Sequence, residues 1–368
     1  MRIPVFVGTY TCPIVFGTGQ ILDGKGEGIY LLELDLETGK LEHIRTVTGV
    51  MNPSYLVFNK KNTCLYAVNE LKEFEGKASG SVTAFRVSQT DATLTYINKQ
   101  ATGGTDPCFV ELNPDGTHLY VCNFMSGSVC VFPISTDGAI GPHSQFIQHN
   151  GSSINLRRQS GPHPHSVIFS PDARYVFVPD LGLDKIVTYR IGSNMQLLTT
   201  VANSWFAVNP GAGPRHGVFD SKGRGFYLIN ELDCTILVLE RLAEDGSFSH
   251  LQTVSSLPED ACVPHNSCAD IHITPNDTYV YGSNRGHNSL IIYKVDQKSG
   301  LLSYAGCQSC EGETPRNFAI DPTGRYLLCA NQDSDSIVVF EIDYDTGMLY
   351  RKSEVTIPTP VCIKPYIF

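Results

Sequence analysis

Charged and polar side chains recur at two fixed points of a unit that repeats along this chain. The first point holds Ser54, Cys108, His165, Arg215, Ala269 and Arg316, and the second holds Glu70, Phe124, Leu181, Glu231, Arg285 and Gln332. A position that served only the architecture would hold similar residues in every unit. Because charged groups near a core need partners, their presence in only some units predicts a binding or catalytic site. The alternative is a set of salt bridges between the units.

The charges at these points suit an anionic substrate. Arginine binds carboxylate or phosphate through two parallel hydrogen bonds, and it stabilises negative charge that builds on oxygen in a transition state. Histidine and glutamate are the natural general acid and base, although the sequence does not assign which acts as which. We therefore predict four catalytic residues: His165, Glu231, Arg215 and Arg285.

Four further side chains are predicted to contact the substrate: His163, Asn284, Arg316 and Gln332. His163 lies two residues before His165, so alternation along a strand places both on one side. Two histidines and a glutamate could bind a metal, but the nearby arginines repel a cation, and we expect no metal. The sequence contains no P-loop, GxGxxG or GxSxG motif, and we expect no cofactor.

The unit that positions these side chains is built from short strands. Six copies begin at Pro53, Pro107, Pro164, Pro214, Cys268 and Pro315. They contain β-branched and aromatic runs such as His118–Cys122, which favour strands, and turns such as Asp321–Gly324, in which Pro and Gly preset the backbone. A recurring Asn or Asp before the second point is expected to stabilise turns. Four short strands in roughly 50 residues are typical of a propeller blade.

The two ends of the chain complete one more blade. Phe6–Tyr10 matches the second strand of a unit, and Thr359–Ile363 matches a first strand. We expect these two segments to pair, which closes the ring and removes its free edges. Residues 1–368 are therefore predicted to form one all-β domain, a seven-bladed β-propeller. The site is expected at one end of the central channel, toward the C-terminal half of the chain.

Composition limits the partners and the location. The net charge of −10 argues against nucleic acid or an anionic membrane as the main partner, so we expect a small anionic substrate. No apolar stretch is long enough for a transmembrane helix, and Met1–Val7 does not resemble a signal peptide. We expect a cytoplasmic protein with free thiols, including Cys108 and the pair Cys307 and Cys310.

A likeness to a known family is sharpest in five strings: Gly161–His165, Gly211–His216, Asn230–Leu232, Ala269–Pro275 and Thr314–Arg316. They resemble the seven-bladed propeller lactonases, which include the bacterial-type 6-phosphogluconolactonase and the fungal carboxy-cis,cis-muconate lactonising enzyme. The likeness covers nearly the whole chain and is closer to the phosphogluconolactonase branch. The active site proposed for the muconate branch falls by motif on His165, Arg215, Arg285 and Glu231.

The resemblance implies a hydrolase that opens a sugar lactone, 6-phosphoglucono-1,5-lactone, to the acid. Two alternatives remain open. One is a cycloisomerase that closes a muconate-type diacid to a lactone, and the other is a non-catalytic interaction scaffold, since a fold alone does not determine function. The chain departs from the family at Asn284, where many bacterial members carry Asp, and the insertion Cys12–Gly19 is expected to reshape the rim of the site.

Overall fold

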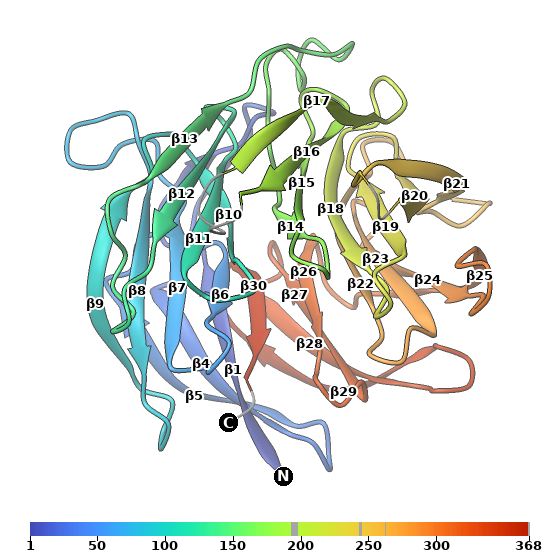
Figure 1. The fold of residues 1–368 in the computed structure, drawn as a ribbon. Helices are drawn as coiled ribbons and strands as arrows, with labels where there is room; N and C mark the ends of the chain where they lie inside the picture. Colours follow the sequence, from blue (N-terminus) through green and yellow to red (C-terminus); the bar gives the residue numbers. More distant parts are fainter. Residues whose placement is uncertain (193–197, 243–244, 262, 367–368) are drawn as a thin grey trace.

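The computed structural model describes residues 1–192, 198–242, 245–261 and 263–366. Within these residues, the strands form seven four-stranded antiparallel sheets and one two-stranded hairpin. The sheets are arranged as blades around a central axis (Figure 1), which confirms the predicted seven-bladed β-propeller. The described part of the chain contains no helix that is long and apolar enough to cross a membrane.

Each blade has four strands, which follow one another from the inside of the ring to the outside. The first blade consists of β30 (Pro360–Pro365), β1 (Arg2–Thr9), β4 (Gly28–Asp35) and β5 (Leu41–Thr48). The second consists of β6 (Leu56–Phe58), β7 (Cys64–Asn69), β8 (Ser81–Val87) and β9 (Leu94–Ala101). The third consists of β10 (Pro107–Leu112), β11 (His118–Asn123), β12 (Ser128–Pro133) and β13 (Gln145–Gln148). The fourth and fifth consist of β14 (Ile168–Phe169), β15 (Tyr175–Asp180), β16 (Lys185–Ile191) and β17 (Leu198–Ala207); and β18 (Pro214–Phe219), β19 (Gly225–Asn230), β20 (Thr235–Arg241) and β21 (Phe248–Ser255). The last two consist of β22 (Ser267–Ile273), β23 (Tyr279–Arg285), β24 (Ser289–Val295) and β25 (Leu302–Ser309); and β26 (Pro315–Ile320), β27 (Tyr326–Asn331), β28 (Ser336–Ile342) and β29 (Leu349–Thr356). The hairpin of β2 (Ile14–Val15) and β3 (Ile21–Leu22) lies in the insertion between β1 and β4.

The ring closes where the sequence predicts. The C-terminal strand β30 pairs antiparallel with the N-terminal strand β1, with Val7 opposite Ile363. Strand β30 therefore supplies the innermost strand of the first blade, and the red and blue ends of the chain meet there in Figure 1. It also contacts β26 and β6, the inner strands of the two neighbouring blades.

Ring closure makes a measurable prediction about stability. Ile363 of β30 is 1% exposed in the core, whereas Ile44 of β5 is 47% exposed. Truncating a buried isoleucine removes packing and leaves a cavity, so Ile363→Ala should lower the free energy of unfolding by about 2–5 kcal/mol. The control Ile44→Ala should change it by about 0.5 kcal/mol or less. Urea unfolding followed by circular dichroism measures both, and equal effects would contradict the closure.

The inner strands carry a bulge at the point where the site residues lie. In β10, β18 and β26 the register shifts by one residue, and the extra residues are Cys108, Arg215 and Arg316. A bulge leaves its extra residue unpaired and turns its side chain away from the regular alternation. The first point of the repeat is therefore a place where the backbone itself directs a side chain out of the sheet.

The recurring Asn residues hold the segments that lead into each blade. The side-chain amide of Asn69 donates to the Met51 carbonyl at 2.7 Å, and that of Asn331 donates to the Cys310 carbonyl at 3.1 Å. Each carbonyl belongs to the connection before the inner strand of the same blade. These bonds fix the start of the inner strand, and hence the position of the bulge that follows.

Candidate active site

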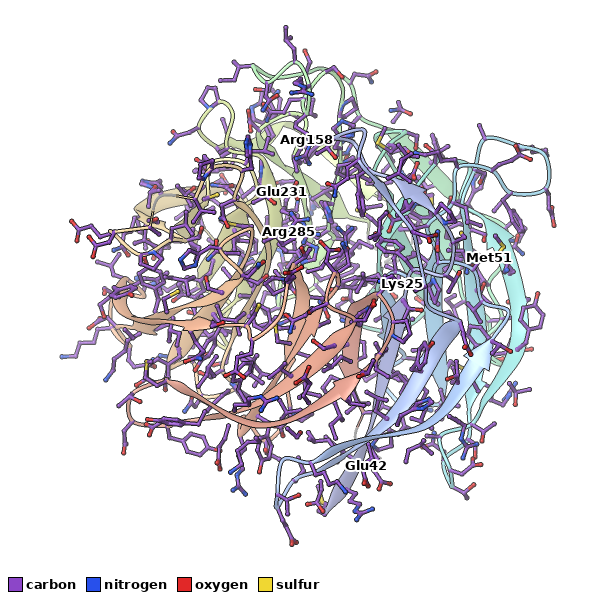
Figure 2. All side chains as sticks on the ribbon, turned by 180° about the vertical axis from the view of Figure 1, so that it is seen from behind. Lys25, Glu42, Met51, Arg158, Glu231 and Arg285 are labelled. Atoms are coloured by element: carbon purple, nitrogen blue, oxygen red, sulfur yellow. The ribbon has the colours of Figure 1, made fainter. Side chains whose placement is uncertain are left out.

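A cavity of about 270 Å³ opens at one mouth of the central channel. Its wall includes Glu70, His165, Glu231, Arg285, Arg316 and Gln332, together with residues of the hairpin insertion. These six residues come from both points of the repeat and from five blades, so the fold brings them together across long distances in sequence. Figure 2 views the ring from behind and labels Glu231 and Arg285 near its centre, with Arg158 beside them.

Three arginines surround one buried carboxylate in this cavity. Arg158 Nη2 lies 2.5 Å from Glu231 Oε1, and Arg215 Nε and Arg285 Nη2 lie 2.9 and 3.0 Å from Glu231 Oε2. Burial alone would raise the pKa of Glu231, but Arg285, Arg158 and Arg215 outweigh it and hold that pKa well below its usual range. Glu231 is therefore an ionised group that fixes the arginines and is a poor proton acceptor.

Backbone carbonyls hold the same arginines in place. Arg215 Nη1 donates to the Ala269 carbonyl, and Arg285 Nη2 donates to the Cys268 carbonyl at 2.6 Å. Arg285 lines the cavity, whereas Arg215 lies behind Glu231. Burial lowers the pKa of Arg285 to about 10, so this group stays protonated at neutral pH. Fixed cationic donors at a buried site are suited to stabilising an oxyanion.

His165 is a neutral imidazole on the cavity wall. It is 6% exposed, and its pKa lies well below the ordinary value for histidine. The largest cause is burial, and repulsion from Arg215 and His216 adds to it. Its Nδ1 lies 3.8 Å from the sulfur of Cys108. A neutral histidine facing a cavity can accept a proton from water, whereas burial raises the pKa of the Cys108 thiol and keeps it protonated.

Arg316 differs from the other arginines because no carboxylate among the described residues lies within ion-pair distance of it. Its guanidinium packs against the rings of Tyr10 and Phe16, 5.4 and 5.3 Å from their centroids. Burial alone would lower the pKa of the Arg316 guanidinium. Tyr10 and Glu70 outweigh that effect and raise the pKa above its usual value, so Arg316 remains charged. Phe16 belongs to the hairpin insertion, so the insertion forms part of the wall around this cation.

Of the three remaining residues predicted to contact the substrate, one lines the cavity and two do not. Gln332 lines the cavity, with its Nε2 bonded to Asp333 and its Oε1 buried without a partner among the described residues. His163 and Asn284 are not among the residues of the cavity wall. The His163 ring stacks on Phe124, with centroids 4.6 Å apart, and Asn284 is fully buried and donates to the Ser256 carbonyl.

The repeat did not reveal two residues that contact the charged groups of the cavity. Arg158 lies in the long connection between β13 and β14, outside both repeating points, and only the basic pair of Arg157 and Arg158 could have drawn attention to it. Tyr10, whose hydroxyl donates to Glu70 Oε2 at 3.0 Å, occupies the second point of the first blade. It could have been found by extending the repeat to the N-terminus.

The described residues contain no group of three or more His, Cys, Asp or Glu side chains that could hold a metal ion. The eleven cysteines that the structure describes are free, and Cys262 lies outside the described residues. Cys307 and Cys310 are both free thiols. The titratable and charged side chains on the cavity wall are those of arginine, aspartate, glutamate and cysteine, together with the buried His165 and the exposed His265.

Comparison with known proteins identifies the family. The model of the family described as "Lactonase, 7-bladed beta-propeller" matches residues 4–365. The chain belongs to the seven-bladed β-propeller lactonases. It is 35% identical over 360 residues to a 6-phosphogluconolactonase of Bacillus subtilis, and the match covers 98% of this chain and 97% of that protein.

Solved structures of the propeller lactonases have the same fold. A putative 6-phosphogluconolactonase of Bacteroides fragilis superposes with a TM-score of 0.89 at 36% identity, covering 100% of this chain and 98% of the other. A periplasmic gluconolactonase of Pseudomonas aeruginosa superposes with a TM-score of 0.90 at 32% identity, covering 100% and 99%. The likeness therefore extends over the whole propeller and includes the strands that carry the cavity.

Proposed function

We propose that this protein hydrolyses a phosphorylated sugar lactone, 6-phosphoglucono-1,5-lactone, to the open-chain acid. The observation that carries the proposal is the pairing of a neutral buried histidine with several fixed arginines around one cavity. Ester hydrolysis needs a base to activate water and cations to stabilise the oxyanion. The names of the relatives in Bacillus subtilis and Bacteroides fragilis support the same choice of substrate.

We assign separate roles to three cavity residues. His165 removes a proton from the attacking water, because its low pKa leaves it unprotonated at neutral pH. Arg285 stabilises the negative charge that develops on the carbonyl oxygen. Arg316 binds the phosphate, because its charge is not taken up by a carboxylate of the described chain. As the ring C–O bond breaks, the proton held by His165 passes to the leaving alkoxide.

We propose that the partner of this protein is a small anionic substrate. Its location in the cell is proposed from the state of its cysteines. We propose a cytoplasmic enzyme because the eleven described cysteines are free, as expected in a reducing compartment. One solved relative is called periplasmic, so cell fractionation with an antibody against this protein is the appropriate test. Recovery only from a periplasmic extract would contradict the cytoplasmic location.

Purified protein and freshly prepared 6-phosphogluconolactone test the activity. The acid released is measured against spontaneous hydrolysis, in parallel with unphosphorylated gluconolactone and a muconate-type diacid. We expect acceleration of lactone opening and no loss of the ultraviolet absorbance of the diene. No acceleration with any lactone would refute the proposal, and loss of diene absorbance would indicate a cycloisomerase instead.

The role of Arg316 predicts a change in substrate preference. A hydrogen bond to a charged group contributes about 1.5–3 kcal/mol, and each 1.4 kcal/mol corresponds to about tenfold. Arg316→Gln should therefore lower the ratio of kcat/KM for phosphorylated over unphosphorylated lactone by about 10- to 100-fold. The matched control is Arg325→Gln, since Arg325 also packs on a tyrosine ring but lies outside the cavity. An unchanged ratio in Arg316→Gln would exclude this assignment.

A further inference from the structure

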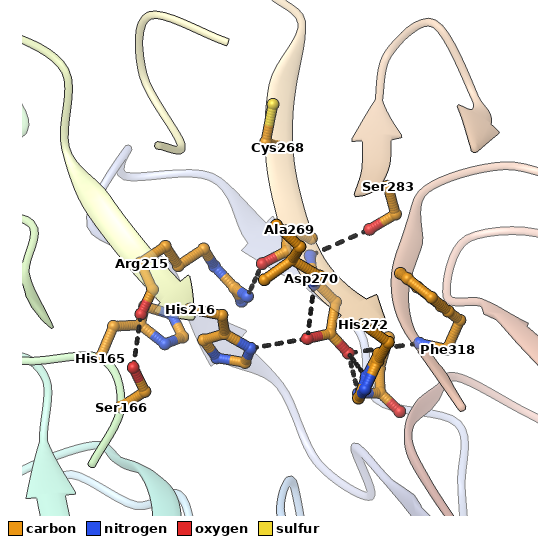
Figure 3. Close-up of polar contacts among 12 residues, drawn as sticks. His165, Ser166, Arg215, His216, Cys268, Ala269, Asp270, His272, Ser283 and Phe318 are labelled. Carbon is orange, nitrogen blue, oxygen red and sulfur yellow. Dashed lines mark hydrogen bonds and ion pairs between the residues drawn. The ribbon is translucent and has the colours of Figure 1, made fainter. Parts of the chain in front are cut away.

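A second row of polar side chains lies in the channel behind the active-site cavity. His216 Nδ1 is 2.8 Å from Asp270 Oδ1, and His272 Nε2 and Asn317 Nδ2 are 3.1 and 2.5 Å from Asp270 Oδ2. Figure 3 shows His216 pointing toward Asp270, with His165 and Arg215 beside it. The roles assigned above to the cavity residues do not use this row. His216 and Asp270 also line a cavity of about 430 Å³ at the opposite mouth.

The protonation state of the row follows from its contacts. Burial would raise the pKa of Asp270, but His272 and His216 hold it well below its usual range, so Asp270 is an anion. Burial and Arg215 lower the pKa of His216 to about 4, so this ring is neutral. The Nδ1–H of His216 therefore donates to Asp270. The other nitrogen, Nε2, carries the lone pair of a hydrogen-bond acceptor.

This acceptor has no partner among the described residues. His216 Nε2 is buried without a hydrogen bond, although buried acceptors are nearly always satisfied by protein or ordered water. His216 lines a void of about 10 Å³ whose wall also includes His165, Arg215 and Arg316. A volume of that order holds one water molecule when the walls supply polar partners. The rings of His165 and His216 are 5.1 Å apart between centroids, at 69°.

We propose that one water molecule in this void joins His165 to His216, and that His216 and Asp270 are positioning residues that take up and return the proton of His165. This inference rests on the proposed lactone hydrolysis. His165 lines both the void and the active-site cavity, so one imidazole can exchange protons on both sides. Burial and Arg215 oppose a proton on either histidine, but on His216 that proton lies opposite the Asp270 carboxylate, to which the ring is hydrogen-bonded.

The steps balance without an added reagent. The attacking water forms a bond to the lactone carbonyl carbon, its O–H bond breaks, and the proton goes to the free nitrogen of His165. The N–H of His165 passes its proton to the water in the void, which gives one of its own protons to His216 Nε2. When the ring C–O bond breaks, the proton returns along the same path to the alkoxide, and both histidines regain their starting state.

The water site is tested by a crystal structure of the full chain at about 1.5 Å resolution. We expect density for a water oxygen about 3 Å from His216 Nε2 and within hydrogen-bond reach of His165. This result does not depend on the identity of the substrate. A void without a water, or a direct bond that turns His216 away from it, would overturn the proposal.

The relay is tested by the kinetics of His216→Gln, with His149→Gln as the matched control. His149 is another buried histidine bonded to an aspartate, with its Nδ1 2.6 Å from Asp180, but it does not line the void. In His216→Gln we expect kcat to fall at least tenfold, KM to change less than twofold, and the rate in H₂O–D₂O mixtures to become linear in deuterium fraction where the wild type is curved. We expect His149→Gln to behave as the wild type.

Three outcomes separate the two proposals. If the wild type hydrolyses no lactone, the proposed function and the relay both fail. If the wild type is active and kcat of His216→Gln stays within twofold of it, only the relay fails. If His149→Gln loses as much activity as His216→Gln, the effect is structural and the relay fails. Thermal melting checks that each variant is folded, and His216→Asn replaces the glutamine variant if that one is not.

Discussion

Replacing His165 by glutamine should lower kcat for lactone hydrolysis by about 10²–10⁴-fold, the usual contribution of a general base, and should change KM only slightly. Glutamine keeps a polar group of similar length at the cavity wall but does not accept a proton at neutral pH. The measurement is steady-state kinetics with 6-phosphogluconolactone, corrected for spontaneous hydrolysis. The reason for a large effect is that His165 is the only histidine on the wall of the cavity, among the described residues, whose ring is buried and uncharged.

The control for this variant is His118→Gln. His118 is as buried as His165, at 6% exposed, but it lies at the start of β11 and does not line the cavity. We expect its kcat to equal that of the wild type. The low pKa of His165 also means that protonation of this group should produce no loss of kcat near pH 6.5. A His165→Gln enzyme with kcat within twofold of the wild type would remove His165 from the mechanism.

Replacing Glu231 by glutamine should lower both stability and activity. The substitution leaves Arg158, Arg215 and Arg285 buried around a neutral amide, and breaking a buried ion pair typically costs about 3–5 kcal/mol. The arginines should then move apart, so that kcat also falls. Urea unfolding at pH 7 gives the change in the free energy of unfolding, and initial rates of lactone hydrolysis give the change in kcat.

The pH dependence of this loss has a defined sign. The folded-state pKa of Glu231 lies below its unfolded value of about 4.3, so its contribution to stability is complete above that value and is lost as the pH falls through the folded pKa. The difference between wild type and Glu231→Gln should therefore shrink in acid. The control is Glu341→Gln, whose partners Arg325 and Lys352 lie at the surface and which should cost about 1 kcal/mol or less. Equal losses would contradict the buried cluster.

The fold could be predicted from the sequence because each blade repeats the same pattern of turn residues and strand-forming residues. Turns such as Asp321–Gly324 lie between strands of β-branched and aromatic residues, and the unmatched strands at the two ends could only complete each other. The bulges at Arg215 and Arg316 could not be predicted from the sequence, because no characteristic residue type occurs at them. They depend on how the inner strand meets its neighbour and on the connection that precedes it.

The site could be predicted only in part, because the repeat identifies only residues at equivalent positions of the blades. A comparison of equivalent positions in the blades identifies residues such as Glu231 and Arg285, which the structure places around one cavity. It does not identify Arg158, because Arg158 lies in a long connection that has no counterpart in the other blades. Alternation along the strand predicted His163 beside a substrate, and the family resemblance predicted Asn284 there. In the structure neither residue lines the cavity, because the His163 ring stacks on Phe124 and Asn284 is fully buried.

A crystal structure of the wild-type protein with the product, 6-phosphogluconate, would test the proposed active site. We expect 6-phosphogluconate to occupy the cavity at the mouth that contains Glu231, with its phosphate bonded to Arg316 and its carboxylate within hydrogen-bond distance of Arg285 and His165. Product bound in the opposite mouth, or with its carboxylate away from His165, would contradict the proposed active site.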